Sequence, residues 1–378
     1  MILTQEQEMI RDAIRAFAQE QIAPFAADWD KNHTFPRQAL RGLAELGVLG
    51  MVVPEEWDGA GLGYLELGLA IEEIAAADGA TSTIVSVQNS LACMILLKYG
   101  SDALRQEWLK PLARGAKLGC FCLTEPHVGS DAGAITTTAR REGDEWVLNG
   151  VKQFITTGKE GDVAIVFAVT DKAAGKKGIS TFLVPTATPG YIVARLEEKL
   201  GQHASDTAQI LFENCRIPAA NLLGKEGEGY KIALSNLEGG RIGIAAQCIG
   251  MARAALEAAV RYAKERTSFG KPLAEHQAIA FLLADMATQL DVARQAVWHA
   301  ASLRDAGRPC LKEASQAKLF ASQMAEKVCS DAIQVHGGYG ITMDFPVERI
   351  YRDVRVCQIY EGASEIQKLV IARAVLAD

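Results

Sequence analysis

The sequence lacks the cysteine and histidine patterns that mark disulfide or metal chemistry. Its eight cysteines include no C-x-x-C pair and no zinc-like spacing, and its six histidines show no H-E-x-x-H or similar ligand spacing. Most of the cysteines lie in or beside apolar stretches. We therefore expect reduced, mostly buried thiols of an intracellular protein, and no bound metal.

The chain also has no excess of positive charge and no uninterrupted apolar run of the roughly 20 residues that span a bilayer. Its 39 basic and 46 acidic residues give a net charge of −7, which offers no electrostatic attraction to nucleic acid. We expect no nucleic-acid partner and no membrane insertion.

We expect no signal or transit peptide at the N-terminus. Thr4 and Gln7 have capping-box spacing, and Ile10, Ile14 and Phe17 form an apolar helical stripe, so folded structure begins at once. The expected location is the cytoplasm of a bacterium, or the mitochondrial matrix if the protein is eukaryotic and processed.

Apolar residues, in contrast, make up 49% of the 378 residues, which predicts two or three subdomains. Helical periodicity dominates residues 1–118 and returns in residues 229–378, where long helices are expected at 230–264, 273–305 and 311–336. Residues 119–228 instead contain short runs rich in β-branched and aromatic residues, typical of antiparallel strands. The predicted class is α+β, with the order α, β, α.

Two segments of the β zone carry groups that suit a heteroaromatic ligand. In FCLTEPHVGSDAG, residues 121–133, hydroxyls and glycines lie next to apolar side chains. In KQFITTG, residues 152–158, Phe154 and Thr156 share one face of a strand and can flank a ring. From the residues alone, an ordinary entry turn and ordinary strand core are the simpler interpretations of the two segments.

Two segments of the C-terminal zone suit a phosphate. Arg266, at the end of a predicted helix, can bind phosphate oxygens, although an exposed helix-end arginine is the simpler interpretation. Gly337 and Gly338 in QVHGGYGIT allow close backbone approach to an anion, or simply stop a helix. His336 is given no catalytic role.

Acidic residues supply the candidate base. Glu361 lies just ahead of a helix that Ser364 can cap, so it is either a helix-start carboxylate or, in a closed pocket, a base with a raised pKa. Glu238 and Arg241, three residues apart, can pair with each other on a helix surface.

Together and in this order, these motifs closely resemble the acyl-CoA dehydrogenase family along essentially the whole chain. FCLTEPHVGSDAG, RTSFGKP and IYEGASEIQ are specific to that family, and the match begins at PEEWDGAGLGYLE. The segments ARREGDEWVLNGVKQFIT, GRIGIAAQ and YRDVR are most similar to the short-chain (butyryl-CoA type) or short branched-chain branch.

The resemblance implies an acyl-CoA dehydrogenase fold: an N-terminal helical domain (1–118), a middle antiparallel β-domain (119–228) and a C-terminal four-helix bundle (229–378). It implies a homotetramer, a dimer of dimers, with FAD between β-domain and bundle and its pyrophosphate and adenosine held across a subunit interface. The cofactor residues that it implies are Phe121, Leu123, Thr124, Ser130, Phe154, Ile155, Thr156, Arg266, Phe269, Gln277, Gln334, Gly337, Gly338, Ala363 and Glu365. The substrate residues that it implies are Ser130, Glu238, Arg241 and Gly362.

The implied reaction is dehydrogenation of a short straight or methyl-branched acyl-CoA to the trans-2-enoyl-CoA. Glu361 would take the α-proton, flavin N5 would accept the β-hydride, and electrons would pass to an electron-transferring flavoprotein. A ribityl hydroxyl and the Glu361 N–H would hold the thioester carbonyl. Some branched-chain relatives carry the base at the position of Gly240, which has no side chain here.

Four departures from the family pattern leave the acyl specificity open: His127, His203, Ala363 and Phe154, where relatives usually have a small residue, arginine, threonine and tryptophan. An acyl-CoA oxidase has the same site but usually a much longer chain, and desulfinase-like members normally lose the glutamate. A catalytically silent CoA-binding paralogue is the remaining alternative.

Overall fold

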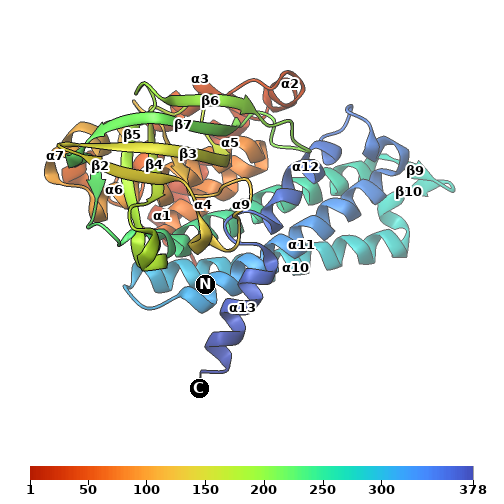
Figure 1. The fold of residues 1–378 in the computed structure, drawn as a ribbon. Coiled ribbons are helices and arrows are strands. Elements are labelled where there is room, and N and C mark those ends of the chain that lie inside the picture. The colour runs from red at the N-terminus through yellow and green to blue at the C-terminus, as the bar shows by residue number, and fades with distance from the viewer. Residues whose placement is uncertain (378) are drawn as a thin grey trace.

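The computed structural model describes residues 1–377 and has the order helices, sheet, helices that the sequence predicts (Figure 1). The capping box at Thr4 is confirmed, because the backbone N–H of Gln7 donates to Thr4 Oγ1 at 3.2 Å and that of Thr4 donates to Gln7 Oε1 at 3.0 Å. The N-terminal helices are α1 (Gln5–Gln21), α2 (Ala26–Asn32), α3 (Arg37–Glu45), α4 (Tyr64–Ala77), α5 (Gly79–Val87), α6 (Met94–Tyr99), α7 (Asp102–Leu104) and α8 (Lys110–Ala113), with a π-helical segment at Gln88–Cys93.

The middle region folds into one sheet of eight strands, in the order β6-β7-β3-β2-β4-β5-β8, with β1 also paired to β4. Most neighbours are antiparallel, as predicted, but β1 runs parallel to β4 and β2 makes one parallel pair with β4. Because β1 enters directly from the helices, no hairpin turn fixes its direction. The strands are β1 (Gly119–Cys122), β2 (Thr138–Glu142), β3 (Glu145–Thr156), β4 (Val163–Val169), β5 (Ile179–Pro185), β6 (Tyr191–Leu196), β7 (Thr207–Pro218) and β8 (Leu222–Leu223).

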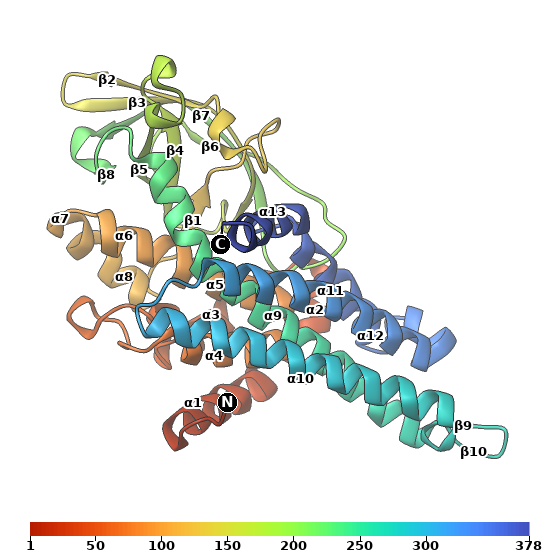
Figure 2. The same ribbon diagram turned by 90° about the horizontal axis from the view of Figure 1, so that it is seen from below.

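The C-terminal region contains three long helices that lie side by side, with α13 packed across α11 (Figure 2). The helical period predicts an apolar stripe on the second long helix at Ile279, Leu282, Leu283, Met286, Leu290, Ala293 and Val297. The last four are buried, because these positions recur on one helical face, and the first three are half-buried. The elements are α9 (Gly229–Glu265), β9 (Thr267–Ser268), β10 (Lys271–Pro272), α10 (Gln277–Asp305), α11 (Leu311–His336), α12 (Val347–Val354) and α13 (Ser364–Val375).

The N-terminal and C-terminal helices share a single apolar core. Ile71 and Ile74 of α4 belong to the same buried cluster as Ile244 and Ala252 of α9. A second cluster joins α6 and α8 to β4 through Leu96, Leu112 and Phe167. The sheet and α9 begin at residues 119 and 229, and the predicted division into three domains at those positions stays a prediction.

Two helical stretches, Gly79–Tyr99 and Gly229–Glu265, are long and apolar enough on composition to cross a membrane. Neither is an uninterrupted apolar run, since the mean hydropathy of a window tolerates the few polar residues that interrupt it. Their most apolar windows are 94% and 78% buried within the protein, which is typical of core helices.

All eight cysteines are free and buried, as predicted.

Candidate active site

Glu361 lies in a sharp turn just before α13. Its φ is +53° and that of Gly362 is +90°, so two consecutive residues adopt the left-handed region. Glycine is required at 362, since a Cβ there would lie 2.6 Å from Gln367 Nε2. Gln367 Nε2 donates to the carbonyl oxygens of Glu361 (3.2 Å) and Gly362 (2.8 Å). A left-handed glutamate costs about 1–3 kcal/mol and is found mainly at functional sites.

The carboxylate of Glu361 occupies the space that a missing side chain leaves on α9. A Cβ on Gly240 would lie 2.7 Å from Glu361 Oε2. This oxygen is shielded from solvent and has no hydrogen-bond partner within residues 1–377. Burial raises the pKa of Glu361 to about 7, against the opposing effects of Arg241 and Lys318. A buried, unpartnered carboxylate that titrates near neutrality is suited to abstract a proton.

Two buried cations face this carboxylate. Arg241 is 4% exposed and its Nη1 donates to Ser315 Oγ at 3.2 Å. Lys318 is fully buried, and its Nζ donates to the Gly362 carbonyl at 2.8 Å. Burial lowers the pKa of both side chains. The sequence analysis missed Lys318, although a lysine between buried alanines on one face of α11 is a detectable signal.

Glu238 and Arg241 do not form the surface pair that one interpretation of the sequence allowed. Arg241 donates to Ser315 Oγ, and the charges of both Glu361 and Glu238 act on its pKa, whereas Glu238 accepts from Arg304 Nη1 at 3.1 Å. Arg304 in turn lies 4.2 Å above the Tyr64 ring. Glu238 lines a cavity of about 540 Å³ whose wall also includes Lys98, Arg304 and Arg308.

On the sheet side, the two predicted segments at 121–125 and 152–156 are joined. The N–H of Gln153 donates to the Thr124 carbonyl at 2.8 Å, and the buried Lys152 Nζ donates to the Leu123 carbonyl at 3.0 Å and to Glu125 at 2.9 Å. Burial acts to raise the pKa of Glu125, but Lys152 and nearby hydrogen bonds outweigh it and lower this pKa to about 2. This buried ion pair, which the sequence analysis missed, fixes the two segments against each other.

Phe154 projects from this junction. Its φ is +58°, it stands at a register shift of β3, and its side chain is 62% exposed. Thr156 is half-buried, whereas Ile155 is 1% exposed within the sheet core and can offer a ligand only its backbone. Phe121 of β1 is half-buried, and Ser130 is exposed on the following loop. An exposed aromatic ring beside hydroxyl groups fits a flat heteroaromatic ligand.

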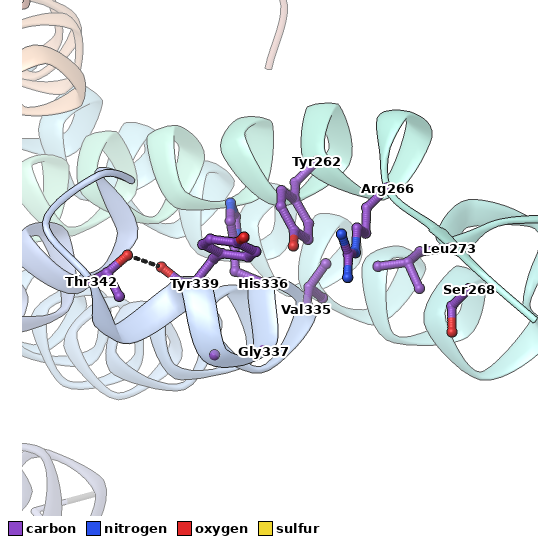
Figure 3. A pocket seen from close by; sticks show the side chains of 10 residues that line it. Tyr262, Arg266, Ser268, Leu273, Val335, His336, Gly337, Tyr339 and Thr342 are labelled. Carbon is purple, nitrogen blue, oxygen red and sulfur yellow. Dashed lines mark hydrogen bonds between the residues drawn. The ribbon is translucent and has the colours of Figure 1, made fainter.

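A second group of predicted residues meets at the far end of α9, around a cavity of about 490 Å³ (Figure 3). Arg266, Gly337 and Gly338 line it, together with the stacked rings of Tyr262 and His336, whose centroids are 4.4 Å apart. A guanidinium and glycine backbone suit a phosphate, and the neighbouring aromatic rings suit a nucleobase. Phe269, 97% exposed at the tip of the β9–β10 hairpin, and the exposed Gln277 and Gln334 lie outside the cavity lining.

The two groups do not form one site within a single chain. Gly240 and Arg266 are 26 residues apart, and the end of α9 is therefore about 39 Å from Glu361 at 1.5 Å per residue. Figures 1 and 2 both show the β9–β10 hairpin at the opposite end of α9 from the sheet. One dinucleotide cannot bridge this separation.

Of the four family departures, Phe154 stands among the candidate residues for the ring and Ala363 directly follows the turn of Glu361 and Gly362, whereas His127 and His203 lie on loops of the sheet region. His127 is exposed at the tip of a turn, and His203 Nδ1 lies 2.9 Å from Asp30 while its ring stacks on His33 at 4.4 Å.

The prediction that Ser364 caps the last helix is wrong. Ala363 occupies the cap position without a side-chain bond, and Ser364 is the first residue of α13. Glu365 is exposed in the first turn.

Comparison with known proteins covers the whole chain. Residues 4–116, 120–215 and 227–376 match the N-terminal, middle and C-terminal domains of acyl-CoA dehydrogenase. The rat mitochondrial short-chain specific acyl-CoA dehydrogenase is 50% identical over 374 residues, which are 99% of this chain and 91% of the relative.

Solved structures show the same likeness. The butyryl-CoA dehydrogenase of Megasphaera elsdenii is 40% identical, with a TM-score of 0.97 over 100% of this chain and 99% of the other. A chain from a structure described as the electron transferring flavoprotein of Acidaminococcus fermentans is 45% identical, with a TM-score of 0.98 over both full lengths. With all three domains matched, the protein belongs to the acyl-CoA dehydrogenase family of FAD-dependent oxidoreductases.

Proposed function

We propose that the protein dehydrogenates a short-chain acyl-CoA, straight or methyl-branched, to the trans-2-enoyl-CoA, with Glu361 as the base. The observation that carries this proposal is the carboxylate of the half-buried Glu361, whose Oε2 is shielded from solvent and unpartnered within residues 1–377 and whose pKa is raised to about 7. A carboxylate in this state gains stability by accepting a proton, whereas an ordinary surface glutamate does not.

The chain's own groups divide the work of proton removal. Glu361 takes the α-proton, and its backbone N–H would donate to the thioester carbonyl, which would stabilise the developing enolate. Arg241 and Lys318 favour the ionised form of Glu361 before the transfer. The proposed contacts to the CoA ester are Arg241 and Gly362, which lie beside the base, and Ser130 and Glu238, which lie farther from it.

When bound, FAD would supply the acceptor for the β-hydride and a route for the electrons to leave. Phe121, Leu123, Thr124, Phe154 and Thr156 fit the flavin ring, since they combine an exposed aromatic with hydroxyl and backbone groups. Arg266, Gly337 and Gly338 fit the phosphates. Because the two groups are too far apart in one chain, we propose that two subunits share each FAD within a homotetramer. Exposed apolar side chains support this assembly: Phe269, Phe281, Ile341, Leu369 and Leu376.

A polar barrier supports the short acyl group. Gln247 lies seven residues beyond Gly240 on α9, about 10 Å farther along the axis. Its Oε1 accepts from the Tyr360 hydroxyl at 2.6 Å, and it is fully buried. A long alkyl chain would have to break this bond and bury the freed groups.

The 45% identical chain from the electron transferring flavoprotein structure supports an electron-transferring flavoprotein as the acceptor.

A substrate panel tests the proposed function. We expect butyryl-CoA to bleach the visible flavin absorbance of the purified holoenzyme under anaerobic conditions, and kcat/KM to fall from C4 to C8 esters. Methyl-branched C4 and C5 esters measure the width of the pocket. Failure of every ester to bleach the flavin, or faster reaction with C8 than with C4, would contradict the proposal, and rapid oxygen consumption would indicate an oxidase.

The pH dependence tests the role of the buried cations. Because the base must be ionised, kcat/KM should rise with pH through about 7. Removing the charge in Lys318→Met should raise the pKa of Glu361 and move this rise to higher pH by about one unit. The Gly362 carbonyl keeps its bond from Gln367 in this variant.

Lys327→Met is the matched control, since Lys327 lies on the outer side of the same helix and pairs with Asp331. Its pH profile should match that of the wild type. An unchanged profile for Lys318→Met would show that this charge does not act on the base.

A further inference from the structure

Four side chains next to the base, three of them buried and Tyr360 half-buried, form a closed ring of hydrogen bonds. The Thr83 hydroxyl donates to Gln202 Oε1 (2.7 Å), and Gln202 Nε2 donates to the Tyr360 hydroxyl (3.2 Å). That hydroxyl donates to Gln247 Oε1 (2.6 Å), and Gln247 Nε2 returns to Thr83 Oγ1 (2.6 Å). Every member gives one bond and receives one, so the donors all point the same way around the ring.

The ring joins segments that are far apart in sequence. Thr83 comes from α5, Gln247 from α9, Gln202 from the loop between β6 and β7, and Tyr360 from the turn before α13. It therefore connects the N-terminal helices, the sheet and the C-terminal helices at one point. Closed chains of hydrogen bonds in a buried site polarise and strengthen one another. Opening any one bond weakens the remaining three.

Gln202 is the member of the ring with an unfavourable backbone conformation, which contacts with α12 hold in place. Its φ is +54°, a region that glutamine rarely adopts, and it is 5% exposed. Its N–H donates to the Asp353 carboxylate, and its Nε2 also donates to the Asp353 carbonyl at 3.2 Å. The preceding Gly201 packs on the backbone of α12, where a Cβ would lie 2.4 Å from the Arg352 carbonyl carbon. In Figure 1 this loop runs from the sheet to α12.

The ring holds the residue that precedes the base. Tyr360 is bonded to Glu361 through the backbone, and Glu361 is itself in a left-handed conformation. On its other side, Gly362 is held by Lys318 and Gln367. The carboxylate has to reach an α-carbon with a tolerance of well under 1 Å, and such a misplacement can cost about 100-fold in rate.

We propose that Gln202 is a positioning residue for Glu361, which acts by closing the ring that fixes Tyr360. The proposal rests on the assignment of Glu361 as the base. It also explains why a loop of the sheet reaches across to the helices at this point. Gln202 needs no contact with substrate or cofactor for this role.

The test separates proton removal from dehydrogenation. Acetyl-CoA has α-protons but no β-carbon, so it cannot be dehydrogenated, and exchange of its α-protons in D2O on the holoenzyme reports on the base alone. The variants are Gln202→Met, Thr83→Val and their combination, measured by NMR exchange and by kcat and KM for butyryl-CoA. We expect each single variant to lower exchange and kcat by about 10- to 100-fold with little change in KM, because the base is displaced but present.

The combination should be no worse than the more severe single variant, because one opening already breaks the ring. Effects that multiply, or wild-type exchange in Gln202→Met, would overturn the proposal. Gln88→Met is the matched control: Gln88 is equally buried and makes three hydrogen bonds, to Leu112, Lys117 and Gly119, away from Tyr360. It should lower the melting temperature without lowering exchange, and an equal loss of exchange would show that general destabilisation suffices.

Glu361→Gln distinguishes failure of the proposed ring from failure of the proposed base. If it abolishes exchange while Gln202→Met has no effect, only the ring fails. If Glu361→Gln leaves exchange intact, the proposed base itself is wrong.

Discussion

Glu361→Gln should bind FAD and butyryl-CoA like the wild type and reduce its flavin at least 10²- to 10⁴-fold more slowly, the range that general base catalysis contributes. The amide has the same shape and can keep the left-handed turn, since Gln367 bonds only to the backbone carbonyls. It cannot accept the α-proton. Anaerobic stopped-flow measurement of flavin absorbance after mixing with butyryl-CoA gives the rate directly.

Glu257→Gln is the control for this substitution, because Glu257 is an exposed acid on α9 that pairs only with Arg253. It should reduce its flavin at the wild-type rate. Near-normal reduction in Glu361→Gln would mean that another group removes the proton, and the assignment would have to be abandoned.

Gly240→Ala should slow flavin reduction by about 100-fold while leaving the fold intact. The new Cβ would lie 2.7 Å from Glu361 Oε2 and 2.9 Å from Cδ, which is closer than real contacts allow. The carboxylate end of a flexible side chain has to move away, so the base leaves its position instead of the helix deforming. In the helix interior, alanine also gains about 0.5–1 kcal/mol over glycine. The melting temperature should therefore hold or rise as the rate falls.

Gly68→Ala provides the comparison, because its Cβ would meet only the Ala246 Cβ at an ordinary 3.9 Å. This variant should keep both the stability and the rate of the wild type. If Gly240→Ala reacts at the wild-type rate, the space at Gly240 is not what positions the base.

Local patterns predicted the elements well. The Thr4 capping box and the stripe around Met286 depend only on residues within one helix, and the structure has both. Strand alternation also placed Phe154 and Thr156 opposite the buried Ile155, even though a bulge interrupts β3 at that point. Resemblance to a family added the assignment of Glu361, for which local chemistry allowed two interpretations.

The groups that set the environment of Glu361 could not be predicted in this way. Lys318 is 43 residues from Glu361 in sequence, and Gln202 is 158 residues from Tyr360. Their proximity is created by packing, on which periodicity carries no information. The prediction that Ser364 caps α13 failed for a local reason, since the left-handed residues at 361 and 362 move the helix start by one residue.

The shared core of α4 and α9 also governs how the chain can be made. α4 can pack on α1 and α5 early, but the part of its apolar face that packs on α9 stays uncovered until α9 exists, so residues near 71 have to wait until those near 252 have left the ribosome. A nascent N-terminal segment therefore stays exposed during the synthesis of the entire sheet, and at about 5–20 residues per second this lasts on the order of ten seconds or more. Holding such a segment soluble during that interval is a task for chaperones, and it makes this enzyme's yield in a cell depend on them as well as on its final stability.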